Sequence, residues 1–299
     1  MEKANFYDQI SKNKRDSLVL GSAVFFILLG LVYVISQILA PGASIVFLIF
    51  GTLIMILYIY GTYNYGDKVV LAATKAKPIE DDDRKYIHLI TVVDGLSIAA
   101  GIPKPKLYVI ESDEINAFAT GKNPKGSSIA VTSGLLKNLK RDEIEGVIGH
   151  EMSHIKNYDI RFATFVAVLV GLVAILSDLL IRSFWYGGGR DRDERNKLGI
   201  LILLGFVLAI FAPILVRIVQ FAVSRKREFL ADAKSVELTR YPEGLASALE
   251  KIMKINQGKM KVSEAVSHLF FADPNKSPLD SLYATHPPPE ERIKILRNM

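Results

Sequence analysis

The chain has 299 residues, of which 50% are hydrophobic and 23% charged, and its net charge is +6. Its mean hydropathy of +0.25 excludes a disordered chain and argues against a wholly soluble one. Cysteine is absent, which excludes disulfides, thiolate catalysis and cysteine-ligated metal sites. Nitrogen ligands for a metal must therefore come from five histidines: His88, His150, His154, His268 and His286.

A pair of membrane-spanning helices is expected at residues 18–63, after a polar tail at 1–17. The pair contains no charged residue, and Pro41-Gly42 divides it into two spans, 18–39 and 44–63. Each is close to the roughly 20 apolar residues that a bilayer core requires. Lysine and arginine occur in the tail but not in the turn, which predicts that the tail and the chain after residue 64 face the cytoplasm.

Residues 64–161 are polar enough to form the first half of a soluble domain. The acidic run at 81–83 is predicted to lie in the first turn of a helix rather than to bind a metal, because acidic side chains stabilise a helix N-terminus. Short apolar segments bounded by turn residues predict three strands, at 106–111, 116–120 and 128–132.

A helix predicted at residues 141–156 carries the sequence His-Glu-Met-Ser-His. His150 and His154 are four residues apart on one helical face, so both can bind the same metal ion. Glu151 can reach a water molecule on that ion without binding the ion itself, and zinc lowers the pKa of such a water to about 7. The pattern therefore predicts one Zn²⁺ per chain, with Glu151 as the general base.

A second, weaker hydrophobic hairpin is expected at residues 162–223. Its uncharged runs, 162–177 and 198–216, either cross the membrane, dip into it, or form long helices in a soluble core. Two crossings would return the chain to the side of the membrane on which His150 lies. A metal ligand after residue 223 must be on that side to bind the same ion as His150. The charged connection at 190–195 would then face outward, against the usual preference for basic residues in the cytoplasm.

Residues 224–299 are expected to form the second half of the soluble domain and to supply a third metal ligand. Glu228 and Asp232 lie four apart on a predicted helix, so one could bind zinc and the other could orient a ligand histidine. Taken alone, such a pair more often forms a solvated helix face. The poorer candidates are His88, His268, Glu237 and Glu250.

Four motifs together resemble the M48 peptidase family and, within it, the HtpX-type bacterial membrane proteases. Their order and spacing agree with the family over nearly the whole chain. The motifs are Asn116–Gly121, His150–His154, Ser224–Ala233 and Thr285–Pro288 with Glu291-Arg292. The resemblance implies a zinc endopeptidase of the bacterial cytoplasmic membrane, multi-pass and with its active site facing the cytoplasm, that removes damaged or misfolded membrane proteins.

The resemblance also assigns roles to single residues. It implies that Glu228 is the third zinc ligand and that Asp232 supports a ligand histidine. His286 is expected to lie near the metal and stabilise the oxyanion, supported by Arg292. The alternative for His286 is a loop histidine held by the prolines that follow it.

The short segment before the active-site helix is expected to bind substrate. Asn116, Ala117 and Phe118 are predicted to lie on an exposed edge strand that pairs with an extended substrate backbone. The alternative is an ordinary interior strand.

The expected fold is mainly α: a helical metallopeptidase domain with a small β-sheet beside the helix that carries His150, plus about four transmembrane helices. The expected partners are protein or peptide substrates and the lipid bilayer, with no nucleic acid; the oligomeric state is not predicted. A transporter is a weaker reading, because the spans lack the internal polar residues that pathways need. An inactive metal scaffold would have no use for Glu151.

Overall fold

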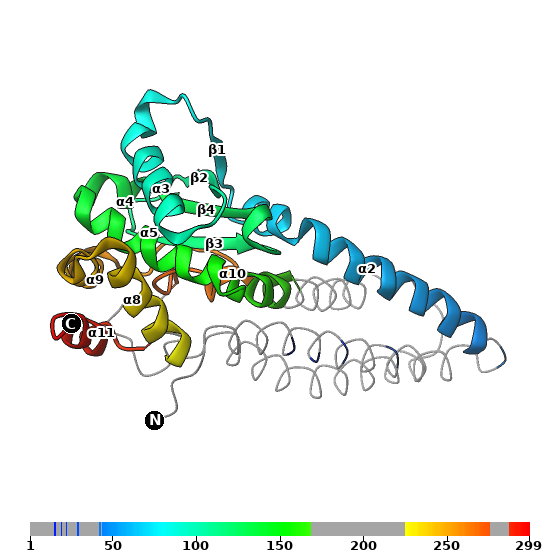
Figure 1. Ribbon diagram of the computed structural model, residues 1–299. Helices are drawn as coiled ribbons and strands as arrows, with labels where there is room; N and C mark the ends of the chain where they lie inside the picture. Colours follow the sequence, from blue (N-terminus) through cyan, green and yellow to red (C-terminus); the bar gives the residue numbers. More distant parts are fainter. Residues whose placement is uncertain are drawn as a thin grey trace, which may run out of the picture.

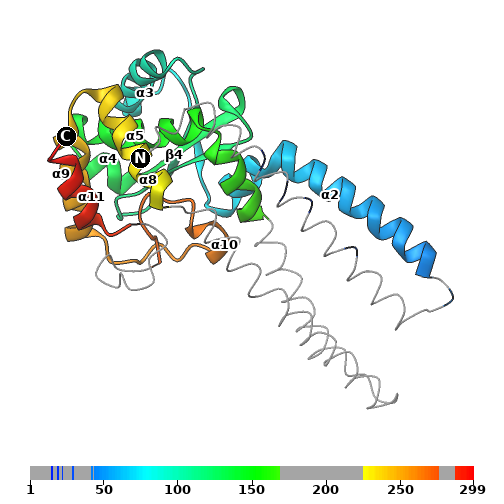
Figure 2. The same cartoon turned by 60° about the horizontal axis from the view of Figure 1, so that its bottom comes forward.

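A long helix projects from a mixed α/β domain in a computed structural model of the protein (Figure 1). The structure describes residues 44–168, 225–275 and 287–299, together with the isolated residues Arg15, Val19, Ser22, Leu29 and Gly42. Figure 2 shows the same helix, α2, leaving one end of the domain. Mostly helical architecture with a small sheet confirms the expected fold class of the domain.

Helix α2 (Ser44–Ala73) is the one candidate membrane span within the described part of the chain, and its apolar side chains are largely exposed. It continues ten residues past residue 63, where the expected span ends. The expected span at 18–39 lies almost wholly outside the described residues, as does most of the hairpin at 162–223. Only residues 162–168 of that hairpin are described, and they are helical. The four-helix count and the expected domain boundaries therefore stay predictions.

The sheet has four strands in the order β1-β2-β4-β3. The bounds are Lys77–Ile79 for β1, Lys106–Ile110 for β2, Ala117–Gly121 for β3 and Ser127–Thr132 for β4. Strands β2 and β4 are parallel, whereas β1 and β3 pair antiparallel to their neighbours. The three predicted strands are confirmed; β1 was not predicted because it is short and contains Pro78, which strands tolerate mainly at an edge.

The expectation that the acidic run begins a long helix is wrong. Helix α3 (Ile87–Ala100) has no acidic residue in its first turn. Instead the Asp83 side chain accepts a hydrogen bond from Lys85 N and caps the short 3-10 helix η2 (Arg84–Tyr86), while Asp81 pairs with Lys104. The run thus caps one turn and binds a lysine, and the main helix starts after it.

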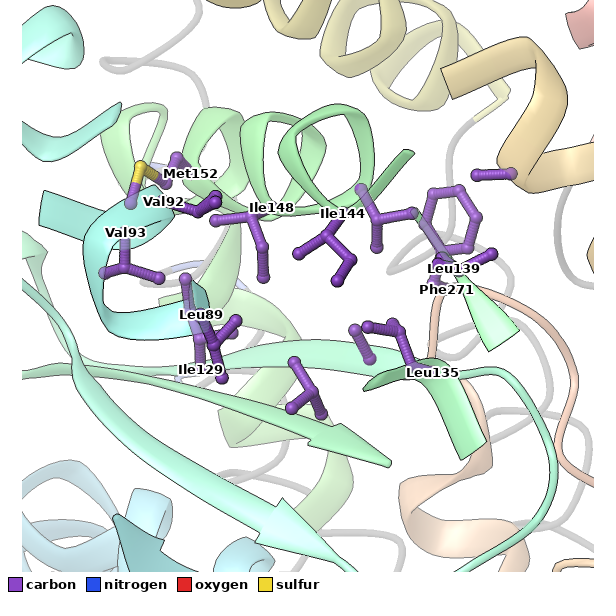
Figure 3. Packing of buried hydrophobic residues seen from close by; sticks show 14 of the residues in the cluster. Leu89, Val92, Val93, Ile129, Leu135, Leu139, Ile144, Ile148, Met152 and Phe271 are labelled. Carbon is purple, nitrogen blue, oxygen red and sulfur yellow. The ribbon is translucent and has the colours of Figure 1, made fainter. Parts of the chain in front are cut away.

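Helix α5 (Arg141–Lys156) has the predicted bounds and lies between the sheet with α3 on one side and helices α8 and α9 on the other. Its apolar face packs Ile144, Ile148 and Met152 against α3 and β4 (Figure 3). The remaining helices are α4 (Ser133–Asn138), α8 (Arg225–Thr239), α9 (Pro242–Ile255), α10 (Glu264–Ser267) and α11 (Pro289–Leu296), and Pro124–Gly126 is the 3-10 turn η3.

Glycines on the other face of α5 allow two helices to approach closely. A Cβ atom on Gly146 would lie 2.7 Å from Leu245 N of α9, and one on Gly149 would lie 2.8 Å from Ser235 Oγ of α8. Ser235 Oγ also donates a hydrogen bond of 2.6 Å to the Gly146 carbonyl. Helix α8, and with it Glu228, is therefore held against the helix that carries the two histidines.

Candidate active site

Three side chains that can bind a metal converge where α5 meets α8. The Nε2 atoms of His150 and His154 are 3.1 Å apart. The carboxylate oxygens of Glu228 lie 3.6 Å from His150 Nε2 and 3.5 Å from His154 Nε2. Two ligands that each bind a tetrahedral zinc at about 2.1 Å are separated by roughly 3.4 Å. The donor set of two imidazoles and one carboxylate, all within 4.8 Å of one another, therefore fits one such ion.

His150 is oriented from behind by a buried ion pair. Its Nδ1 lies 2.9 Å from Asp232 Oδ1, and Arg292 donates to the two oxygens of Asp232 at 2.7 and 2.8 Å. The guanidinium of Arg292 also stacks over the Phe271 ring, 4.7 Å from its centre. Because Asp232 accepts at Nδ1, the Nε2 lone pair of a neutral His150 is directed at the ligand cluster.

The charges of this group shift its pKa values in opposite directions. Burial alone would raise the pKa of Asp232, but the Arg292 guanidinium and His150 lower it to about 2. Burial would lower the pKa of His150, but the carboxylates of Asp232 and Glu228 outweigh that and raise it to about 9. Asp232 therefore remains a carboxylate, and a metal at the cluster must compete with a proton on His150.

His154 has a comparable support that the sequence analysis missed. Its Nδ1 lies 2.9 Å from Asp159 Oδ2, and Arg227 Nη1 lies 3.9 Å from the other oxygen of Asp159. Tyr158 has a φ of +62°, so the chain turns sharply after α5 and brings Asp159 back to the histidine. A carboxylate five residues beyond the second histidine is a signal in the sequence, but its meaning depends on that turn.

The competing ligand candidates lie elsewhere or outside the cluster. His88 is exposed on α3, Glu237 pairs with Lys234, and Glu250 pairs with Arg297. His268 lines the same pocket, and its Nε2 lies 3.3 Å from the Ala163 carbonyl oxygen. His286 lies outside the described residues, so its expected place near the metal is untested.

Glu151 lies beside the ligand cluster in a pocket that β3 also borders. It is 3% exposed and lines the pocket together with the three candidate ligands, Ala119, Arg227 and Phe270. A carboxylate in this place can receive a proton from a water molecule bound in the pocket.

Strand β3 is at an edge of the sheet, as expected, but the expectation that it is exposed is wrong: all five of its residues are buried. The reason is a covering segment at residues 268–272. Phe271 N donates to the Ala117 carbonyl at 2.8 Å, and Ala272 exchanges two hydrogen bonds with the Asn116 side chain. The Phe118 ring meets the Phe270 ring edge-on at 4.9 Å.

One backbone position of β3 faces the pocket between two covered ones. The Asn116 carbonyl accepts a hydrogen bond from the backbone N–H of Thr132, the last residue of β4. Because backbone groups alternate in direction along a strand, those of Ala117, Ala119 and Gly121 face the outer edge of the sheet. Ala117 is covered by Phe271, and Gly121 N donates to Thr164 Oγ1 at 3.2 Å. Ala119, between them, lines the pocket.

The site brings two imidazoles and a carboxylate to one point, and a second glutamate lies beside them on α5, within the His-Glu-x-x-His (HExxH) motif. This arrangement defines a metallopeptidase site. The sequence model of peptidase family M48 matches residues 84–299, and the chain belongs to this family. It is 44% identical over 303 residues to the protease HtpX homolog of Dictyoglomus thermophilum, covering 100% of this chain and 96% of that protein. The corresponding homolog of Streptococcus uberis is 40% identical over 302 residues, covering 98% and 99%.

The fold also resembles a solved structure, Ste24p of S. mikatae, with a TM-score of 0.50 and 20% identity over 97% of this chain and 67% of that one. This likeness concerns the fold alone. The family and its HtpX-type members confirm the resemblance seen in the sequence and make the chain a membrane metallopeptidase. A transporter or an inactive scaffold is no longer needed to explain the motifs.

Proposed function

We propose that the chain is a zinc-dependent endopeptidase of the bacterial cytoplasmic membrane that cleaves damaged or misfolded membrane proteins on the cytoplasmic side. The observation that carries this proposal is the meeting of His150, His154 and Glu228 at distances that suit a tetrahedral ion, with Glu151 in the same pocket. Zinc is typical of the family, and the donor set suits it.

The chemistry divides between a metal and the protein. Bound zinc would polarise the scissile carbonyl and make a water molecule more acidic. Glu151 takes the proton from a water molecule in the pocket as this water attacks the carbonyl carbon, and later passes the proton to the amine that leaves. His150 and His154 hold their Nε2 lone pairs toward the cluster because Asp232 and Asp159 fix the opposite ring nitrogens.

Substrate is proposed to pair with the outer edge of β3. Ala119 is the anchor, since its backbone faces the pocket beside Glu151. Pairing at Ala117 as well requires Phe271 to leave the edge. The backbone groups of Asn116 and Phe118 are directed at β4, so these two residues would flank the substrate strand without pairing with it. A substrate strand would then replace hydrogen bonds of the kind that the covering segment makes.

His286 is proposed to stabilise the oxyanion, with Arg292 supporting the site. Arg292, six residues after His286 in the chain, is 2% exposed and binds Asp232. His286→Ala should lower turnover while zinc content stays constant. Unchanged turnover in that variant would remove His286 from the mechanism.

The cytoplasmic orientation follows from the basic tail and the uncharged turn at residues 40–43. A reporter fused at residue 110, the last residue of β2, should report the cytoplasm. An extracytoplasmic signal would overturn the proposed topology.

The decisive experiment compares the purified full chain with Glu151→Gln and a matched control, Glu145→Gln. Glu145 is on the same helix and pairs with Arg141, so the control removes the same charge outside the pocket. Wild type and control should contain one zinc per chain and cleave casein, whereas Glu151→Gln should contain zinc and cleave at least about 100-fold more slowly. Substantial cleavage by Glu151→Gln, or absence of zinc from active wild type, would contradict the proposal.

A further inference from the structure

Two cations meet on one tyrosine where α2 reaches the peptidase domain. The guanidinium carbon of Arg161 lies 5.0 Å from the centre of the Tyr63 ring, and Lys122 Nζ lies 5.5 Å from it. Lys122 Nζ also donates a 3.1 Å hydrogen bond to Asn64 Oδ1. Tyr63 and Asn64 belong to α2, Lys122 to the loop between β3 and β4, and Arg161 to the helical residues 159–168 that follow α5.

No carboxylate neutralises these two cations among the residues that the structure describes. Neither Lys122 nor Arg161 has an Asp or Glu oxygen within 4.0 Å there, and this includes Asp67, the first carboxylate on α2. Lys104, by contrast, binds both Asp81 and Asp94. Two positive charges thus lie at one tyrosine ring and have uncharged partners only among the described residues, an arrangement that favours an anion from outside the chain.

The position of Tyr63 along α2 matches the edge of a bilayer core. From Ser44 to Tyr63 the helix rises about 30 Å, the thickness of the hydrocarbon region. Tyr60 and Tyr63 are exposed, as in an aromatic belt at the headgroup level. The first charged side chains on α2, Asp67 and Lys68, follow within about two turns.

A second contact places Arg161 at the same level. Tyr58 OH donates to the Val168 carbonyl at 3.1 Å, so α2 and the helical residues 159–168 lie side by side. Tyr63 is five residues beyond Tyr58 and Arg161 is seven residues before Val168. Each is therefore displaced from that contact by roughly 7–10 Å, away from the apolar part of its helix.

We propose that Lys122 and Arg161, which both contact the Tyr63 ring, bind the phosphate headgroup of an anionic phospholipid in the leaflet next to the peptidase domain. The lipid phosphate supplies the missing negative charge, and its acyl chains lie along the exposed apolar surface of α2. Lys122 is only three residues from Ala119, so a bound lipid would also hold the substrate edge of β3 close to the membrane surface. The chemistry identifies the class, an anionic phospholipid, and not one species.

The test is native mass spectrometry of the full chain in detergent, titrated with phosphatidylglycerol or with phosphatidylcholine of the same acyl length. Wild type should bind phosphatidylglycerol more tightly, and Lys122→Gln/Arg161→Gln should lose affinity for it on the order of tenfold. The charge-matched control Lys137→Gln/Lys254→Gln removes two exposed cations elsewhere on the domain and should bind like wild type. Lys122→Arg/Arg161→Lys keeps both charges and should retain the affinity, which separates charge from folding.

Equal binding of the two lipids by wild type would overturn the proposal, as would unchanged phosphatidylglycerol affinity in a folded Lys122→Gln/Arg161→Gln variant. Inorganic phosphate provides the remaining arm. Millimolar phosphate should compete poorly, because it lacks acyl chains that lie on α2. Competition as effective as that of the lipid would assign the site to soluble phosphate and contradict the membrane role.

Discussion

His154 and Asp159 are joined by a 2.9 Å contact between Nδ1 and Oδ2, the same separation that joins His150 to Asp232. Both proposed histidine ligands of the metal are thus held from behind by a carboxylate, and each carboxylate lies beside an arginine. The two supports differ in strength. Arg292 binds Asp232 through two short hydrogen bonds, whereas Arg227 is 3.9 Å from Asp159.

This pairing predicts that Asp159 contributes to metal affinity without binding the metal. Asp159→Ala should weaken zinc binding by roughly 10–100-fold, because His154 loses the group that fixes its ring. Asp159→Asn should retain part of the affinity, since its amide oxygen can still accept from Nδ1. Competition with a chelator measures the affinity, and Glu237→Gln on the exposed face of α8 is the control. Wild-type affinity in Asp159→Ala would show that the contact is not needed.

A second prediction separates the third ligand from its neighbour one turn away. Glu228→Ala should be isolated largely free of metal, because two histidines alone leave the ion without its carboxylate. Asp232→Ala should keep some zinc and cleave poorly, since it removes a support and leaves Arg292 buried without its partner. Metal content by mass spectrometry and casein cleavage are measured together. Full zinc occupancy in Glu228→Ala, with an empty site in His268→Ala, would reverse the assignment.

The sequence predicted helix α5 and the shared face of His150 and His154, because helical periodicity alone places residues four apart on one face. It could not predict which face of β3 is covered, because the covering residues 268–272 are about 150 positions later in the chain and contact β3 only after folding. The same holds for Asp159, whose role depends on the left-handed turn at Tyr158. Local patterns thus identified the chemistry, and long-range contacts decided access and support.

The acidic run at 81–83 shows a different limit of the sequence. Acidic residues before an apolar periodic segment predict a helix start, but Asp81 binds Lys104, 23 residues away, and Asp83 caps a separate turn. A surface ion pair of this kind contributes little stability, so the pair alone does not explain why the helix begins later. The error was one of boundary, and α3 itself was predicted.

A third prediction concerns pH. The neutral form of His150 is the one that binds metal, and in the metal-free protein its pKa is raised from 6.5 to about 9, chiefly by Asp232 and Glu228 against the effect of burial. Below pH 9 zinc must displace a proton, so the apparent zinc affinity should rise with pH up to about 9 and level off above it. A slope approaching tenfold per pH unit would correspond to one proton.

The same shift should act on stability in the opposite direction. The folded pKa lies above the unfolded one, so its stabilising effect is fully present below pH 6.5 and is lost as the pH rises through about 9. The melting temperature of the protein in a chelator should therefore fall over that range. His150→Gln should remove this dependence, and a melting temperature that rises with pH in wild type but not in the variant would contradict the assignment.

The last prediction tests how helix α5 is held against α9 in the second half of the domain. In Gly146→Ala the added methyl carbon would lie 2.7 Å from Leu245 N, which is too close for an unstrained contact. Helix α9 would have to shift, and the variant should lose about 1–3 kcal/mol of stability. Gly95→Ala is the matched control, because Gly95 lies on α3 with no atom within 4 Å of the added methyl. In the control, alanine should stabilise the helix by about 0.5–1 kcal/mol. Thermal unfolding of both variants distinguishes the two effects: a lower melting temperature for Gly146→Ala and an equal or higher one for Gly95→Ala. If Gly146→Ala were as stable as wild type, the close approach of α9 to the HExxH helix would not be a requirement of the fold.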